Sequence, residues 1–379
     1  MNWREERAGV LAQARCIVVK VGSAVLAGPE GLDTGVMEML VAQLAFLRKR
    51  GCRVVLVSSG AVAAGRAALG PERDTRSMAG KQAASAVGQS RLMHGYDQIF
   101  AKHELLSAQV LLTRDDLRVR GRFLNVRNTF TALLDWGAVP VVNENDTVAV
   151  QELRFGDNDC LAGLLLNVAE AELFINLTSA GGVFSADPQR DPNAGILPCI
   201  ERVRELKLDE VCGGKTTLGT GGMYSKLLAA RRAAQLGVPT LILPGREARV
   251  IERAFAGEEL GTWVRPEAQS VSRRKYWLAY QSEPQGEVEV DAGAAAALVE
   301  RGSSLLPGGI RRVEGNFQPA ALVRIHIQGR TLGVGLSNYS AADLRRIMGR
   351  PRAEAEALLG DAHYPEAVHR DNMLIDAAL

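Results

Sequence analysis

The chain has few cysteines and no long apolar run. Its five cysteines are scattered, and no two of them have C-x-x-C spacing, so neither a zinc site nor a dithiol site is predicted. An odd, unclustered set of cysteines is typical of a protein kept in a reducing compartment. No apolar run approaches the roughly 18 residues that a membrane-spanning helix needs, and the first residues have no apolar signal-peptide core. We therefore expect a cytoplasmic protein without a membrane partner.

The chain also lacks an excess of either charge. Its formal net charge is +2, so there is no global electrostatic argument for binding nucleic acid or a membrane surface. Hydrophobic residues make up 47% and charged residues 23% of the chain, which is typical of a globular protein. A length of 379 residues exceeds what one ordinary core accommodates, so two domains are predicted.

The first two thirds of the chain alternate between strand-like and helix-like segments. Helical apolar spacing occurs at 33–51 and 123–137. Short runs rich in Val, Ile and Leu predict strands at 16–23, 53–60, 107–113, 138–145, 172–178 and 238–244. Such strands between helices predict an α/β fold with a mainly parallel sheet covered on both faces.

The composition changes after residues 260–277, where short strand-like segments and one or two helices follow. This pattern predicts a small, mostly-β second domain. The expected organisation is a first domain, a linker, a second domain and a tail at 1–266, 267–284, 285–365 and 366–379.

Polar or glycine-rich segments follow four of the predicted strands, at 20–23, 58–60, 143–146 and 178–179. Ligands of parallel α/β sheets bind beyond the carboxyl ends of the strands. An ordinary loop explains any one of these segments equally well. Four segments converging on one edge favour a ligand site.

The stretch "VCGGKTTLGTGGMYSK" at 211–226 contains two different glycine-lysine patterns. Its first half ends in G-K-T, as a P-loop does, but Asp209 stands where a P-loop needs its first glycine. The segment before it is also helix-like rather than a strand. We therefore reject a P-loop and expect Lys215 to be a solvent-exposed lysine.

The second half of that stretch is the better phosphate site. Gly219, Gly221 and Gly222 allow backbone N–H groups to approach a phosphate at the start of the following helix. Lys226 lies on the first turns of this helix, and Lys20 leaves the first strand beside another glycine. Two lysines and two glycine-rich loops at one sheet edge suit phosphoryl transfer, which depends on positioning and charge stabilisation.

A site for the phosphate acceptor is predicted from a second polar cluster. Asp157, Asn158 and Asp159 follow one another at a helix start. Helix capping explains one of them but not all three. Together with the "NEND" segment at 143–146, these carboxylates and amides suit the ammonium group of an amino acid. The residues 58–60, at another helix N-terminus, suit its carboxylate.

The motifs "VVKVGSAVL", "VLVSSGAVAAGR", "VPVVNENDTVA", "FGDNDCLAGLLLNVA" and "LGTGGMYSK", in this order, resemble those of the amino acid kinase family. The later motifs "ERGSSLLPGGI", "VEGNF" and "AVHRDNM" are similar to a PUA domain. The resemblance implies an open αβα sandwich, ATP with Mg²⁺, and phosphorylation of the side-chain carboxylate of L-glutamate to L-glutamyl 5-phosphate. It also implies proline biosynthesis as the pathway, homo-oligomers (dimers or tetramers) and feedback inhibition by proline.

The resemblance also implies a role for individual residues. Lys20 and Lys226 would stabilise the transferring phosphoryl group, and Asp159 would hold both lysines; no protein ligand to a metal is implied. The implied glutamate-binding residues are Ser59, Asp146, Asp157 and Asn158. The implied nucleotide-binding residues are Lys20, Gly22, Thr178, Ser179, Thr220, Gly221, Gly222 and Lys226. The chain departs from the family pattern at Ser179, where an aspartate is usual, and at Ala24, where a hydroxyl is common.

Three other functions are compatible with parts of the pattern. A sibling kinase would act on N-acetylglutamate, aspartate or carbamate, but "GDND" and the PUA-like segment favour free glutamate. An RNA-binding protein would use the PUA-like segment, but residues 267–379 hold 13 Lys/Arg against 14 Asp/Glu and so no basic face is predicted. A nucleotide-binding regulator without catalysis would not need Lys20, Lys226 and Asp159, which are all present.

Overall fold

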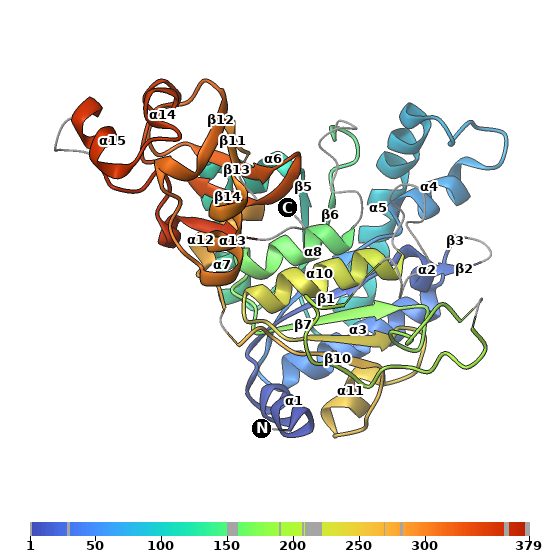
Figure 1. Cartoon of the computed structure of the whole chain (residues 1–379). Coiled ribbons are helices and arrows are strands. Elements are labelled where there is room, and N and C mark those ends of the chain that lie inside the picture. The colour runs from blue at the N-terminus through green and yellow to red at the C-terminus, as the bar shows by residue number, and fades with distance from the viewer. Residues whose placement is uncertain are drawn as a thin grey trace. The chain divides into compact units, whose positions relative to one another are not determined.

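The computed structural model describes residues 2–28, 31–149, 158–188, 191–206, 208, 222–268, 270–280, 283–359 and 364–375. The chain divides into two compact units, Met1–Ser270 and Val271–Leu379. The division falls inside the range expected to be the linker. Each unit has a sheet of its own (Figure 1) and is described by itself.

The first unit is built on an eight-stranded sheet. In spatial order its strands are β5 (Ser107–Leu112), β6 (Val139–Glu144), β4 (Arg53–Ser58), β1 (Cys16–Val21), β7 (Leu173–Thr178), β9 (Thr240–Pro244), β10 (Thr262–Val264) and β8 (Cys199–Ile200). Neighbouring strands are parallel except for β9 and β10. All the strands predicted from Val/Ile/Leu runs belong to this sheet, and the predicted mainly parallel α/β class is confirmed.

Helices cover both faces of this sheet (Figure 1). One face packs on α1 (Trp3–Gln13), α3 (Thr34–Lys49), α5 (Met78–Lys102) and α11 (Val250–Phe255). The other face carries α7 (Arg120–Asp135), α8 (Asn158–Val168) and α10 (Met223–Gln235). The remaining short elements are α2 (Ser23–Leu26), β2 (Ala27–Gly28), β3 (Gly31–Leu32), α4 (Ala61–Leu69) and α6 (Arg114–Arg118).

Strand β1 shows how a sheet buried on both faces also carries a charged residue. All six of its residues are buried. Because side chains alternate along a strand, Ile17, Val19 and Val21 point into the core shared with α3. Lys20 lies on the opposite face, toward α8 and α10.

Helices α4 and α5 pack unusually closely because glycines line their contact. A Cβ atom on Gly65 would lie 1.7 Å from the carbonyl oxygen of Ala84, and one on Gly88 would lie 1.8 Å from that of Ala61. No side chain fits at either position. This contact sets the place of α5, whose polar side chains reach the loop after β6.

The second unit has a five-stranded sheet in the order β12 (Ile310–Gly315), β11 (Gly286–Val290), β13 (Leu322–Ile327), β14 (Arg330–Leu336) and β15 (Met373–Ile375). Its helices are α12 (Arg273–Tyr280), α13 (Ala292–Arg301), α14 (Ala341–Ile347) and α15 (Arg352–Leu359), with single 3₁₀ turns at Pro307–Gly309 and Arg370–Asn372. A separate apolar core holds the unit together.

Two parts of the second unit differ from the predicted boundaries. The segment expected to be a linker contains α12, in which Tyr276 is fully buried and its ring packs on Tyr280 at 4.8 Å. The segment expected to be a tail contains β15, which pairs with β14. Buried aromatic residues and strand pairing thus extend this unit at both ends.

Within the described part of the chain, no helix combines the length and apolarity that crossing a membrane requires.

Candidate active site

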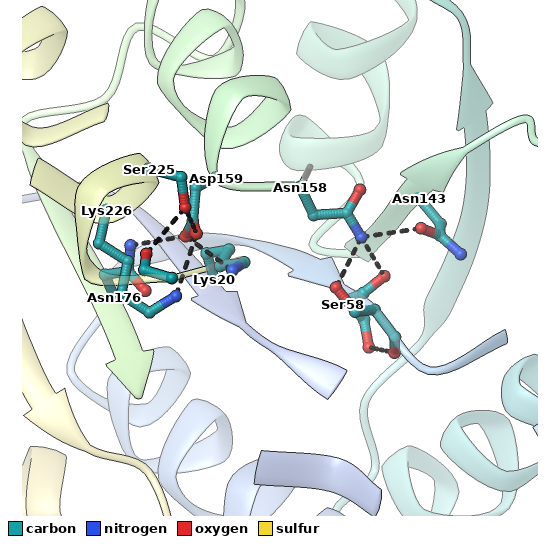
Figure 2. Close-up of polar contacts among 10 residues, drawn as sticks. Lys20, Ser58, Asn143, Asn158, Asp159, Asn176, Ser225 and Lys226 are labelled. Atoms are coloured by element: carbon teal, nitrogen blue, oxygen red, sulfur yellow. Dashed lines mark hydrogen bonds and ion pairs between the residues drawn. The ribbon is translucent and has the colours of Figure 1, made fainter. Parts of the chain in front are cut away.

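Two lysines and one aspartate meet at the carboxyl edge of the first sheet (Figure 2). Lys20 Nζ lies 2.6 Å from Asp159 Oδ1, and Lys226 Nζ lies 3.0 Å from Asp159 Oδ2. Lys20 comes from β1, Asp159 from the first turn of α8 and Lys226 from the first turn of α10. All three side chains are buried. Segments separated by more than 200 residues therefore build one charged cluster.

The cluster carries an excess of positive charge. Burial acts to raise the pKa of Asp159, but the neighbouring ammonium groups of Lys20 and Lys226 hold it below its ordinary value. The carboxylate is therefore ionised at neutral pH and neutralises only one of two lysines. A buried site with this balance attracts an anion.

Backbone of glycine residues lies beside the lysines. A Cβ atom on Gly22 would lie 3.6 Å from Lys20 Nζ, so the backbone of the loop after β1 lies close to this ammonium group. Gly222 is the N-cap of α10 and has no side chain with which to cap the first N–H groups of the helix. Thr178 is the last residue of β7, and Ser179 follows it at the same edge. This arrangement fits a bound phosphate chain.

A second cluster, of amides and hydroxyls, lies on the β4 side of the lysines (Figure 2). The Nδ2 group of Asn158 donates to Ser59 Oγ and to Asn143 Oδ1, both at 2.9 Å, and to the carbonyl oxygen of Ser58 at 3.2 Å. The donor end of this amide is therefore fully used. Its acceptor end, Oδ1, can accept a hydrogen bond from a further donor.

Helix α5 supports this second cluster from behind. Asn143 Nδ2 donates to Gln89 Oε1 at 2.9 Å, and Ser85 Oγ donates to Asp146 Oδ2 at 2.8 Å. Gln89 is nine-tenths buried, and its Nε2 group has no hydrogen-bond partner in the described part of the chain. The amide of Asn143 is thereby oriented with its oxygen toward Asn158.

Another support is the buried Tyr96 of α5. Ser58 Oγ donates to the carbonyl oxygen of Ser59 and lies 2.8 Å from the Tyr96 hydroxyl. Burial raises the pKa of Tyr96 well above its ordinary value, so the phenol stays protonated. This contact fixes the loop between β4 and α4.

The structure brings together most of the residues that the sequence singled out. Lys20, Asp159 and Lys226 form the first cluster, and Ser59 and Asn158 contact each other in the second. Asp146 is tied to α5 instead, through Ser85. Asp157, Thr220 and Gly221 lie outside the described residues, as does Lys215.

Three supporting residues were missed by sequence reasoning: Asn176, Ser225 and Gln89. Asn176 Nδ2 and Ser225 Oγ both donate to Asp159. One signal was available for Asn176, which is the single amide in the apolar strand sequence "LFINLT". No comparable signal marks Ser225 or Gln89, because hydroxyls and amides are common on helices.

Comparisons with known proteins agree with this geometry. A model of the amino acid kinase family matches residues 15–244, and a model of the PUA domain matches residues 286–359. The chain therefore belongs to the amino acid kinase family and carries a PUA domain after the kinase domain.

Curated relatives align along nearly the whole chain and share one name, glutamate 5-kinase. The relative from Nitratidesulfovibrio vulgaris (strain DP4) is 68% identical over 380 residues, and that from Oleidesulfovibrio alaskensis is 64% identical; both alignments cover 100% of each chain. The relative from Geobacter sulfurreducens is 46% identical over 97% of this chain and 100% of its own.

Proposed function

We propose that this protein transfers the γ-phosphoryl group of ATP to the side-chain carboxylate of L-glutamate. The products are ADP and L-glutamyl 5-phosphate, and the reaction is the first step of proline biosynthesis. The observation that carries the proposal is the buried Lys20–Asp159–Lys226 cluster at the carboxyl edge of the sheet. The name shared by the curated relatives supports the choice of glutamate.

The cluster fits the electrostatic demand of this reaction. A glutamate side chain is already ionised at neutral pH, so the reaction needs no general base. Its barrier includes repulsion between an anionic nucleophile and an anionic phosphate. Lys20 and Lys226 counter this repulsion, and Asp159 keeps both ammonium groups in place before the substrates arrive.

The amide cluster on the β4 side is our proposed glutamate site. The oxygen of Asn158 would accept from the substrate ammonium, with Asp146 and Asp157 adding negative charge. The α-carboxylate would lie at the N-terminus of α4, beside Ser59, where backbone N–H groups are available. Acceptor oxygens and negative charge around the substrate nitrogen favour a charged ammonium group. The site would therefore select a free amino acid over one whose nitrogen is acylated.

The nucleotide would occupy the edge between the lysines and β7. We assign Gly22, Thr178, Ser179 and residues 220–222 to it. In the described part of the chain, no group of three or more His, Cys, Asp or Glu side chains is placed to hold a metal ion. Mg²⁺ would arrive on the nucleotide phosphates, where it would supply further neutralisation of the phosphate charge.

Homo-oligomerisation, proline inhibition and a cytoplasmic location also belong to this proposal. Homo-oligomerisation and proline inhibition rest on the family resemblance, and the cytoplasmic location rests on the scattered, unclustered cysteines.

Trapping the acyl phosphate with hydroxylamine tests the proposal directly. The purified protein would be incubated with ATP and Mg²⁺ and, in parallel, with L-glutamate, N-acetylglutamate or L-aspartate, each with and without proline. We expect hydroxamate from L-glutamate only, with less of it when proline is present. Hydroxamate from another acid instead would contradict the substrate assignment while leaving phosphoryl transfer in place.

A further inference from the structure

Four donors, two charged and two neutral, surround Asp159. Its Oδ1 accepts from Lys20 Nζ at 2.6 Å and from Asn176 Nδ2 at 2.9 Å. Its Oδ2 accepts from Lys226 Nζ at 3.0 Å and from Ser225 Oγ at 2.8 Å; the same hydroxyl also lies 2.9 Å from the carbonyl oxygen of Gly222. A carboxylate offers about four lone-pair sites, so each oxygen receives one ammonium and one neutral donor (Figure 2).

Asn176 is an unexpected residue for its position. It lies in β7, where every residue is buried, and is itself fully buried. Its partner across the β1–β7 register is Lys20. Among the described residues, its Oδ1 has no hydrogen-bond partner. A buried acceptor without a partner destabilises the fold, so the amide does not serve packing. Its Nδ2 group donates to Asp159.

We propose that Asn176 and Ser225 are positioning residues of the phosphoryl-transfer site, each placing one neutral donor on one oxygen of Asp159. The proposal rests on the function proposed above. The two donors fix the plane of the carboxylate and leave one lone pair on each oxygen. Lys20 and Lys226 are thereby held on separate oxygens, with their remaining N–H groups directed to other acceptors, among them the transferring phosphoryl group.

Loss of the Asn176 donor would act on the chemical step. The carboxylate would be free to rotate toward Lys226, and Lys20 would follow its partner. Small displacements of a positioned catalytic group lower the rate by up to roughly a hundredfold. The glutamate site would change little, because Asn158 is held by Ser58, Ser59 and Asn143 rather than by Asp159.

The first test is Asn176→Leu, which keeps a similar volume and removes the donor. We expect kcat to fall about tenfold to a hundredfold, KM for the acid to change less than about threefold, and the thermal midpoint to stay within about 3 °C. Ser225→Ala should lower kcat severalfold, and Ser225→Thr, which keeps a hydroxyl, should restore it. The matched control is Ile175→Val, on the opposite face of the same strand.

Two outcomes would overturn the proposal. One is a kcat of Asn176→Leu within about twofold of the wild-type value. The other is an equal loss of kcat in Asn176→Leu and Ile175→Val when both variants lose the same thermal stability. The loss of kcat would then follow from destabilisation of the fold and indicate a structural role. The acid used is whichever one the wild type phosphorylates. A failure of the glutamate assignment is therefore visible in the wild type and distinct from a failure here.

A second readout does not depend on turnover. The donor from Asn176 contributes to the lowered pKa of Asp159, after the larger effect of the two lysines. Its removal should move the acid midpoint of the Asp159 carboxyl upward, as followed by ¹³C NMR on aspartate-labelled protein. An unchanged midpoint in Asn176→Leu would show that the amide does not act on Asp159 and would refute the proposal.

Discussion

At the residue scale, we expect the two lysines of the glycine-rich stretch to have different roles. Lys226 lies on the first turn of α10, is buried and contacts Asp159. Lys215 lies outside the described residues, and the sequence predicts that it is exposed to solvent. If the second half of the stretch binds the phosphate, Lys226 is required for turnover and Lys215 is not.

We therefore predict that Lys226→Ala abolishes turnover, with kcat reduced by about a thousandfold or more. Lys215→Ala should leave kcat within about twofold. Both are measured in the hydroxamate assay at saturating substrates. Circular dichroism of Lys226→Ala provides the folding control, because this variant removes one of the two ion pairs of the buried Asp159 that the described residues form. Equal losses in the two variants would contradict the assignment of the phosphate to Lys226.

At the scale of elements, α5 connects the packing of the kinase domain to its substrate site. Gly88 lets α5 approach the backbone of α4, and Ser85 and Gln89 of the same helix hold Asp146 and Asn143. A displacement of α5 would therefore move two groups of the proposed glutamate site at once. Packing and binding are coupled through this one helix.

This coupling predicts the result of Gly88→Ala. The new methyl group would meet the carbonyl oxygen of Ala61, so the free energy of unfolding should fall by about 1–3 kcal/mol, and KM for glutamate should rise more than kcat falls. The control is Gly9→Ala in α1, where a Cβ has no neighbour within 4 Å and the change should stabilise the helix by about 0.5–1 kcal/mol. Urea unfolding and steady-state kinetics measure both effects. An unchanged stability of Gly88→Ala would refute the close packing.

At the scale of the whole molecule, the chain has two units with separate cores. The Lys20–Asp159–Lys226 cluster and the amide cluster both lie in Met1–Ser270. We propose that the PUA domain acts on assembly and regulation.

We predict that a chain ending at Ser270 folds and phosphorylates the same acid, with kcat within about threefold of the full chain. Its oligomeric state and its response to proline should both change. Light scattering and the hydroxamate assay with a proline titration measure these properties. Unchanged assembly together with an unchanged proline response would rule out a regulatory role for the PUA domain.

Much of the architecture was predictable because local patterns encode it. Val/Ile/Leu runs identified β1, β4, β5, β6, β7 and β9, and glycine- and lysine-containing motifs identified Lys20, Asp159 and Lys226. The extent of the second unit was not predictable, because α12 and β15 are held by ring packing and by pairing with a distant strand. The supporting roles of Asn176, Ser225 and Gln89 were also missed, because their partners lie elsewhere in the sequence.

The amino-acid sequence by itself determined the class of fold, the order of its elements and the residue types available for phosphoryl transfer. These properties follow from hydrophobic periodicity and from short motifs, which are local. Only the tertiary structure decided which oxygen of Asp159 receives which lysine, and that Asn176 lies opposite Lys20 across two parallel strands. The register of a sheet and the direction of a buried hydrogen bond depend on packing between segments far apart in the chain.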